Sequence, residues 1–276
     1  MELTFLGTGT SAGVPMIGCS CPVCTSEDPR DRRTRPSVLL SLDDPTAPDG
    51  ARRLLVDTAQ ELRLQCVREG VARIDGVLYT HAHADHVYGL DDLRRFNPGR
   101  GQSLPLYAEE ATDAALRSLF RYVFEDGHNP NDGYVPRLAL QRIEVGVPFR
   151  PLPTLDLTVT PLRLMHGKLP VLGFRFDAPA GSLAYCTDCS EVPLAAMAGL
   201  RGLDVLVLDA LRPEEHPTHL TTGKALSIVE ELAPGEAFLT HMAHNVPHAE
   251  LEAATPPGVH PAYDGLRVRV GAAAPA

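Results

Sequence analysis

The segment His81-Ala82-His83-Ala84-Asp85-His86 places four potential metal ligands within six residues. Imidazole nitrogens and carboxylate oxygens bind Zn²⁺ and Mn-like divalent cations. The segment follows an expected strand and precedes an expected helix. Because alternate residues at a strand end point the same way, His81 and His83 can share one cation. Asp85 and His86 can reach a second cation at the start of the helix, so we interpret the segment as part of a two-metal centre.

Three later apolar runs each end in a further potential ligand. His166 follows LDLTVTPLRLM, Asp188 ends SLAYCTD, and His241 ends EAFLTH. A strand would deliver each polar group to a shared rim. Taken singly, His166 has the ordinary interpretation of a loop histidine and Asp188 that of a helix cap. Taken with the first segment, the three residues predict enough ligands for two cations.

The cysteines form a second group of candidate ligands. Cys19, Cys21 and Cys24 place three thiolates in one short loop, where a closed tetrahedral zinc site would need a fourth ligand. Free buried thiols and a redox centre are the alternatives. Cys186 and Cys189 flank the aspartate named above and resemble a thioredoxin-like pair, but a strand-to-turn position already explains that segment.

The composition limits the classes of partner and compartment. The formal net charge of −10 repels nucleic-acid backbones and argues against a nucleic-acid partner. The arginines of segment 30–35 lie beside aspartates and are expected in a solvated loop. No segment approaches the roughly 18 consecutive apolar residues of a membrane span. The first residues are typical of a strand and not of a signal peptide, so we expect no membrane association and a cytoplasmic location.

Ten segments rich in β-branched and aromatic residues are expected to be strands, and four segments show helical periodicity. The expected strands are 3–7, 37–42, 53–58, 76–81, 155–162, 171–176, 182–188, 204–210, 236–241 and 266–270. The expected helices are 59–70, 86–96, 111–124 and 222–232. This order predicts two packed sheets with helices outside, in a single domain over residues 1–276. Segment 124–138, rich in Gly, Pro, Asn and Asp, is expected to be a loop near the mouth of the site.

These motifs together resemble the metallo-β-lactamase superfamily, and within it the phosphoribosyl cyclic phosphate phosphodiesterase group. The resemblance covers nearly the whole chain. It includes the start Gly7–Pro15 with the cysteines that follow, the Thr240-His241-x-x-His244 motif and the late Tyr263-Asp264-Gly265. It implies a four-layer αββα sandwich and a homodimer. The glycines at the start could let the backbone approach a substrate phosphate.

The resemblance also implies a role for each candidate residue. One cation, Mn or Zn, would be held by His81, His83 and His166, and the other by Asp85, His86 and His241. Asp188 would bridge the two, and a hydroxide between the cations would attack a small phosphodiester, which can be cyclic. Asp85 and His219 count as catalytic residues, with His219 as general acid and His216 as its competitor. His244 would complete a structural zinc site with Cys19, Cys21 and Cys24.

Other functions use similar features. A tRNA 3′-processing endoribonuclease shares the metal motif, but the net charge and the lack of a basic arm argue against it. A pyrroloquinoline quinone biosynthesis protein shares the cysteine-rich start, but is expected to have an incomplete ligand set. A non-enzymatic metal-binding or redox module does not need seven ligands for a metal pair. A lactonase or thioester hydrolase remains open, because the same activated water attacks carbonyls.

Overall fold

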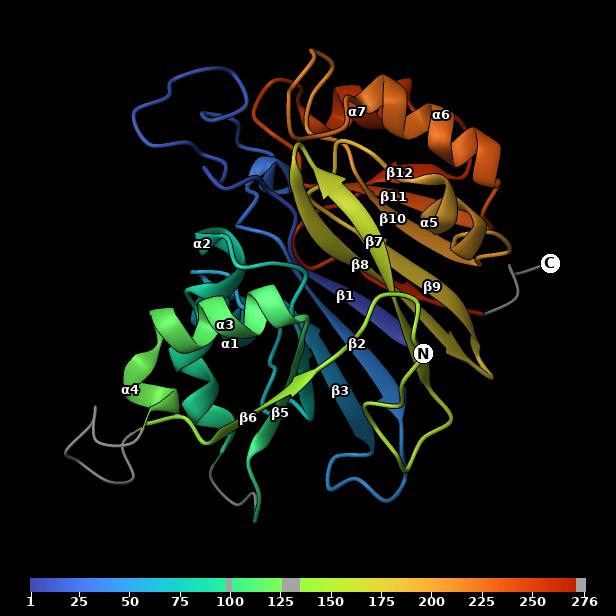
Figure 1. The fold of residues 1–276 in the computed structure, drawn as a ribbon. Coiled ribbons are helices and arrows are strands. Elements are labelled where there is room, and N and C mark those ends of the chain that lie inside the picture. The colour runs from blue at the N-terminus through green and yellow to red at the C-terminus, as the bar shows by residue number, and fades with distance from the viewer. Residues whose placement is uncertain (98–100, 126–134, 272–276) are drawn as a thin grey trace.

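Two β-sheets pack face to face, and helices cover the outer side of each (Figure 1). The computed structural model describes residues 1–97, 101–125 and 135–271. The seven-stranded sheet consists, in order, of β13 (Arg267–Arg269), β1 (Glu2–Gly7), β2 (Ser37–Asp43), β3 (Ala51–Val56), β4 (Gly76–Leu78), β5 (Leu104–Ala108) and β6 (Leu138–Arg142). The six-stranded sheet consists, in order, of β12 (Val259–Pro261), β11 (Glu236–Thr240), β10 (Val205–Asp209), β9 (Gly181–Cys186), β8 (Leu169–Ala178) and β7 (Thr158–His166).

Each sheet has an antiparallel half and a parallel half. Strands β13, β1, β2 and β3 pair antiparallel, whereas β3, β4, β5 and β6 pair parallel. In the second sheet β7, β8 and β9 pair antiparallel, and β9, β10, β11 and β12 pair parallel. The carboxyl ends of parallel strands lie at one edge of a sheet, and polar loops that follow them can meet there.

The helices divide between the two outer faces (Figure 1). The loops of the first sheet contain α1 (Leu62–Arg68), α2 (Ala84–Val87), the 3₁₀ segment η2 (Leu90–Phe96), α3 (Glu110–Leu119) and α4 (Arg121–Phe124). The connections between strands of the second sheet contain α5 (Leu194–Gly199), α6 (Thr222–Leu232) and α7 (His248–Ala254), and the 3₁₀ turn η1 (Pro29–Asp31) lies in the N-terminal loop. The four layers are therefore helix, sheet, sheet and helix, which confirms the predicted αββα class.

Three apolar cores hold these layers together. The core between the sheets contains Phe5, Phe174 and Phe176, all almost fully buried. A second core lies against α5 and α6 and includes Met197 and Val229, and a third lies against α1 and α3 and includes Leu62. Burial of apolar surface at about 25 cal/mol per Å² is the main stabilising contribution to such layers.

Two predicted elements around the metal motif are wrong in their extent. The strand predicted over 76–81 ends at Leu78, so His81 and His83 project from a loop and not from alternate strand positions. The helix predicted over 86–96 is a short α2 followed by the 3₁₀ segment η2, with a break at Gly89. A Cβ on Gly89 would lie 2.1 Å from the carbonyl oxygen of Ala59, so the chain at this point packs too closely for a regular helix with a side chain.

One N-terminal prediction needs a correction. Arg33 is not solvated: it is 1% exposed and pairs with Asp31. Two glycines of the first loop are required by backbone packing, because a Cβ on Gly7 would lie 1.9 Å from the carbonyl oxygen of Arg35 and one on Gly9 2.5 Å from that of Arg33. The approach of this loop to a substrate phosphate stays a prediction.

The sequence analysis missed several short elements, namely β5, β6, β12, α5 and α7. Pro105 lies inside β5, and proline lowers the strand signal. The helix predicted over 111–124 divides into α3 and α4 at Phe120, whose φ and ψ are −115° and 47°. Most of the predicted loop 124–138 lies outside the described residues. Within the described ranges, none of the helices has the length and apolarity of a bilayer span.

Candidate active site

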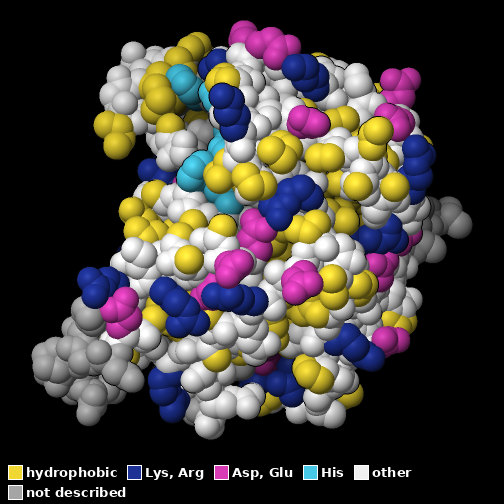
Figure 2. All heavy atoms as spheres, viewed as in Figure 1, with side chains coloured by type: hydrophobic (Ala, Val, Ile, Leu, Met, Phe, Trp, Pro, Cys, Tyr) yellow, Lys and Arg dark blue, Asp and Glu magenta, His cyan; other side chains and the backbone are white. Residues whose placement is uncertain are grey.

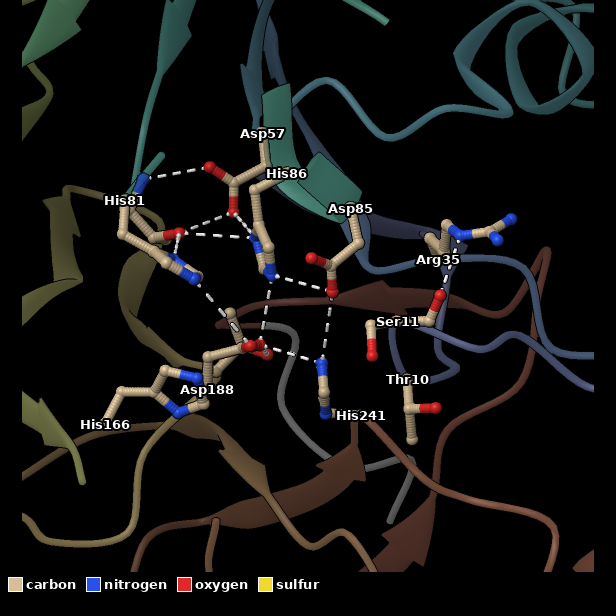
Figure 3. A network of polar contacts seen from close by, with 12 residues as sticks. Thr10, Ser11, Arg35, Asp57, His81, Asp85, His86, His166, Asp188 and His241 are labelled. Carbon is tan, nitrogen blue, oxygen red and sulfur yellow. Dashed lines mark hydrogen bonds and ion pairs between the residues drawn. The ribbon is translucent and has the colours of Figure 1, made fainter. Parts of the chain in front are cut away.

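The candidate ligands converge at the strand ends where the two sheets meet (Figure 3). The loop after β4 and the start of α2 supply His81, His83, Asp85 and His86, and β7 ends at His166. Asp188 and His241 follow β9 and β11, the first at two residues and the second directly. Asp188, His241 and Asp57, which directly follows β3, have left-handed backbone, with φ of 52°, 59° and 62°. Such a turn redirects the side chain at the end of the strand, and Asn, Asp and His adopt it more readily than other non-glycine residues.

The ligands form two neighbouring sets. The ligand atoms of His81, His83 and His166 all lie within 4.8 Å of one another. The same limit holds for Asp85, His86, Asp188 and His241. The structure thus brings together all seven residues that the sequence analysis selected for a metal pair, in the predicted two groups.

Asp188 lies between the two sets. Its Oδ1 is 3.2 Å from Nε2 of His86 and 3.0 Å from Nε2 of His241. Its Oδ2 faces the other set, at 3.9 Å from Nε2 of His81. One carboxylate oxygen toward each set is the arrangement that a bridging ligand requires.

Several buried nitrogen atoms of the site fit a cation. The Nε2 atoms of His81, His86 and His241 are buried and face carboxylate oxygens of Asp188, but no contact to them among the described residues has the geometry of a hydrogen bond. A buried polar atom without a partner costs about 1–3 kcal/mol. Divalent cations would satisfy these atoms, and the His and Asp donor set suits Zn²⁺ or Mn²⁺.

Asp57 and Thr80 orient two of these histidines. Nδ1 of His86 donates to Oδ2 of Asp57 at 2.7 Å. The Thr80 hydroxyl donates to the same oxygen at 2.8 Å, and accepts from Nδ1 of His81 at 3.0 Å. With both Nδ1 atoms used as donors, Nε2 is in each ring the nitrogen left to bind a metal. The sequence analysis missed Asp57, although it ends the apolar run RLLVD, the same signal that selected Asp188.

The charges of the site are strongly coupled. Burial lowers the pKa of His81 and that of His166, and so favours the neutral form that binds a cation. Burial acts in the same direction on His241, but the carboxylate of Asp188 outweighs it and raises the pKa of His241 to about 10. Burial opposes ionisation of Asp188, yet His241 and His86 hold its pKa well below the usual range. The site therefore keeps its carboxylate ionised, and a cation would replace protons on the second set of histidines.

His219 lies against the site, and its ring is oriented by Asp209. Its Nδ1 is 2.8 Å from Oδ2 of Asp209, and its ring centroid is 4.6 Å from those of His166 and His241. The competing His216 is 5.1 Å from His219 between ring centroids and belongs to none of the candidate metal clusters among the described residues. The sequence analysis also missed Asp209, which ends the apolar run DVLVLD.

The cysteine loop forms a separate cluster with His244. The Sγ atoms of Cys19, Cys21 and Cys24 are 3.4, 3.3 and 3.6 Å from Nδ1 of His244. The backbone N–H of Cys24 donates to Sγ of Cys21. This hydrogen bond, together with the smaller effect of the contact with His244, lowers the pKa of Cys21 to about 6. Three sulfur atoms and one imidazole nitrogen are a donor set for structural zinc.

The two clusters share one segment of chain, residues 241–248. The N–H of Met242 donates to the carbonyl oxygen of Thr8 at 2.9 Å. Buried Arg33 donates to the carbonyl oxygens of Ala243 and Val246, and Asp31 accepts from the N–H of His248. Hydrogen bonds at Met242, Ala243, Val246 and His248 thus fix the loop that carries His241 and His244 to the N-terminal segment.

Cys186 and Cys189 lie outside both clusters. Each is fully buried as a free thiol, and burial raises the pKa of Cys186 to about 12. A thiol in this state is a poor nucleophile, so the thioredoxin-like interpretation has no support from its surroundings.

Comparison with known proteins agrees with this geometry. The β-lactamase superfamily domain model matches residues 52–242, more than half of the chain. The chain belongs to the metallo-β-lactamase superfamily. It is similar to the crystal structure of a diphosphatase from the PhnP family, with 41% identity, a TM-score of 0.85, and coverage of 97% of this chain and 96% of the other. That similarity supports the predicted resemblance to the phosphoribosyl cyclic phosphate phosphodiesterase group.

Two other relatives of the chain carry names that point to other activities. An octanoyltransferase from Porphyromonas gingivalis is 39% identical over 268 residues, which are 96% of this chain but 51% of that protein. The chain spans about half the length of this relative. A coenzyme PQQ synthesis protein B from Methylobacterium nodulans is 30% identical over 236 residues, covering 76% of this chain and 72% of the relative. The superfamily match and the similarity to the PhnP-family diphosphatase support a metal-dependent hydrolase, but the names of these relatives do not agree on one substrate.

Proposed function

We propose that the chain hydrolyses a small phosphodiester, linear or cyclic, with two divalent cations. The observation that carries the proposal is the place of Asp188, whose two carboxylate oxygens face two separate sets of histidines. The similarity to a PhnP-family diphosphatase over nearly the whole chain supports phosphoryl chemistry. The bound pair would lower the pKa of a water molecule and stabilise charge on the phosphoryl oxygens.

The chain's own residues prepare this chemistry. His81, His83 and His166 would hold one cation, and Asp85, His86 and His241 the other, with Asp188 shared. Asp57 and Thr80 orient two imidazoles from one side. The carbonyl oxygen of Thr218 orients a third, because it accepts from Nδ1 of His166 at 2.7 Å. The ligands are therefore positioned by the fold before any substrate binds.

In this proposal His219 is the residue that moves a proton. Asp209 holds its Nδ1–H, so Nε2 is the atom free to carry a proton toward the leaving alkoxide. A positioned general acid of this kind contributes roughly 10²–10⁴-fold to a rate. Asp209 keeps the ring oriented.

The test is a comparison of three chromogenic substrates. The purified protein is loaded with Mn²⁺ or Zn²⁺ and given bis(p-nitrophenyl) phosphate, p-nitrophenyl acetate and a chromogenic β-lactam. We expect the phosphodiester to be hydrolysed much faster than the other two. Faster hydrolysis of the carboxyl ester would replace the proposal by a lactonase or thioesterase function. Metal-loaded protein that leaves all three intact would exclude hydrolysis and favour a role like that of the PQQ synthesis relatives.

A tRNA 3′-processing activity is tested with a precursor tRNA in the same assay. The formal net charge of −10 opposes its binding, and we expect no cleavage. Octanoyl transfer is not part of the proposal, because the relative with that name is about twice as long as the aligned region.

A further inference from the structure

Lys168 lies at the tip of the hairpin that carries His166. Gly167 and Lys168 form the turn between β7 and β8, and His166 pairs with Leu169 across it. The side chain of Lys168 is exposed. Because Lys168 follows the candidate metal ligand His166 by two residues, the turn that carries it lies beside the candidate active site.

The hairpin is fixed against the segment that leads to His219. Gly167 has a φ of 63°, and its N–H donates to Oγ of Ser190 at 2.9 Å. A Cβ on Gly167 would lie 2.9 Å from Cγ2 of Thr218, so the turn packs directly on that residue. Lys168 thus lies in a turn that packs directly on Thr218, the residue before the candidate general acid His219. Figure 2 shows histidine side chains and basic side chains close together on the face that it presents.

The charge of Lys168 is not neutralised. Among the described residues, the lysine and arginine side chains without a carboxylate oxygen within 4.0 Å are those of Arg32, Arg63, Arg95 and Lys168. Arg63 and Arg95 line a groove between α1 and η2, and Arg32 directly follows η1. Lys168 is therefore the one unpaired cation of the described chain that is next to a candidate ligand.

We propose that Lys168 binds a second anionic group of the substrate, a phosphate or diphosphate oxygen outside the scissile phosphoryl group. This inference rests on the proposed function and names a specificity residue for it. The formal net charge of −10 repels a multiply charged substrate, so a cation beside the site is needed to attract the part that the metal pair does not reach. A lysine on its flexible stem is suited to this role, because it acts as a point charge for phosphate oxygens in many orientations.

The experiment compares two probes with the same scissile bond. They are p-nitrophenyl thymidine 5′-phosphate and its 3′-phosphorylated counterpart, both given to the metal-loaded protein. We expect the wild type to have the higher kcat/KM for the phosphorylated probe, and Lys168→Ala to reduce the ratio of the two kcat/KM values about ten-fold through KM. Lys168→Arg should restore most of the ratio. Arg95→Ala removes the same charge away from the site and should leave the ratio as in the wild type.

Each other outcome points to a different failure. A ratio that Lys168→Ala leaves unchanged, or a wild type with no preference, would overturn the role of Lys168. General damage to the fold would lower kcat/KM for both probes alike and would not move the ratio. If the wild type hydrolyses neither probe, the proposed function itself fails. Raised ionic strength should reduce the wild-type preference, because an exposed ion pair is screened.

Discussion

The two candidate metal clusters differ in how much of the fold they need. The thiolate cluster takes three of its four ligands from a six-residue stretch, Cys19–Cys24, and two of its sulfur atoms accept hydrogen bonds from backbone N–H groups of the same loop. The histidine and aspartate cluster takes ligands from residues 81 to 241 on both sheets, and Asp57 and Thr80 support them. In the thiolate cluster only His244 comes from the second sheet, whereas each set of the dispersed cluster needs ligands from both sheets. Loss of metal from the thiolate cluster should therefore affect mainly its own loop, whereas loss of metal from the histidine and aspartate cluster should affect catalysis.

Asp188→Asn is the strongest way to test the dispersed cluster. Asparagine tolerates the left-handed backbone at this position, so the change removes the charge and leaves the turn. We expect phosphodiester hydrolysis to fall by more than the roughly 10²–10⁴-fold that one general acid contributes. Elemental analysis should find the catalytic cations depleted and the zinc of the cysteine loop retained. Full retention of both catalytic cations would contradict a bridging role.

His219→Ala separates proton transfer from metal binding. We expect turnover to fall by roughly 10²–10⁴-fold with unchanged metal content, because His219 is next to the ligands but has Asp209 as its partner. The same substitution at His216 is the matched control, and it should have a much smaller effect. Metal loss in the His219 variant would mean that it is a ligand and not the acid.

Asp57→Asn weakens a hydrogen bond that orients the dispersed cluster and leaves every candidate ligand unchanged. The amide keeps the size and tolerates the φ of 62°, but it no longer provides a charged acceptor for Nδ1 of His86. We expect the affinity for the catalytic cations to fall by about 10–100-fold, as for other residues that orient metal ligands. Titration with Mn²⁺ against activity measures the shift, and saturating metal should restore much of the turnover. A wild-type titration curve would exclude this orienting role.

Cys21→Ser should have the smallest effect on catalysis. One zinc equivalent per chain should be lost, and limited proteolysis should cut the N-terminal loop faster than in the wild type. We expect turnover to fall by less than about ten-fold, because Met242 still pairs with Thr8 and Arg33 still holds Ala243. Unchanged zinc content would refute the structural site, and loss of all activity would show that the clusters are not separable.

The sequence predicted the candidate site better than the elements that position it. His81 and His86 were found because ligand types crowd into one segment, and Asp188 because a polar residue ends an apolar run. Asp57 and Asp209 end apolar runs as well, but a lone carboxylate after a strand has no partner that the sequence can show. Their roles depend on hydrogen bonds across 29 and 10 residues, which only the packed sheets create. The short strands β5 and β12 were missed for a related reason, since their neighbours in the sheets provide what their own sequences lack.

The left-handed backbone at Asp57, Asp188 and His241 limits how this site can change during evolution. A β-branched residue at any of these positions would add about 1–3 kcal/mol of conformational strain to the loss of the original group. Accepted replacements are therefore confined mainly to Asn, Asp, His and Gly, so the metal chemistry can drift only among closely related ligand sets. A lineage that gives up hydrolysis should first acquire glycine or asparagine here, and gain stability as it loses the enzyme.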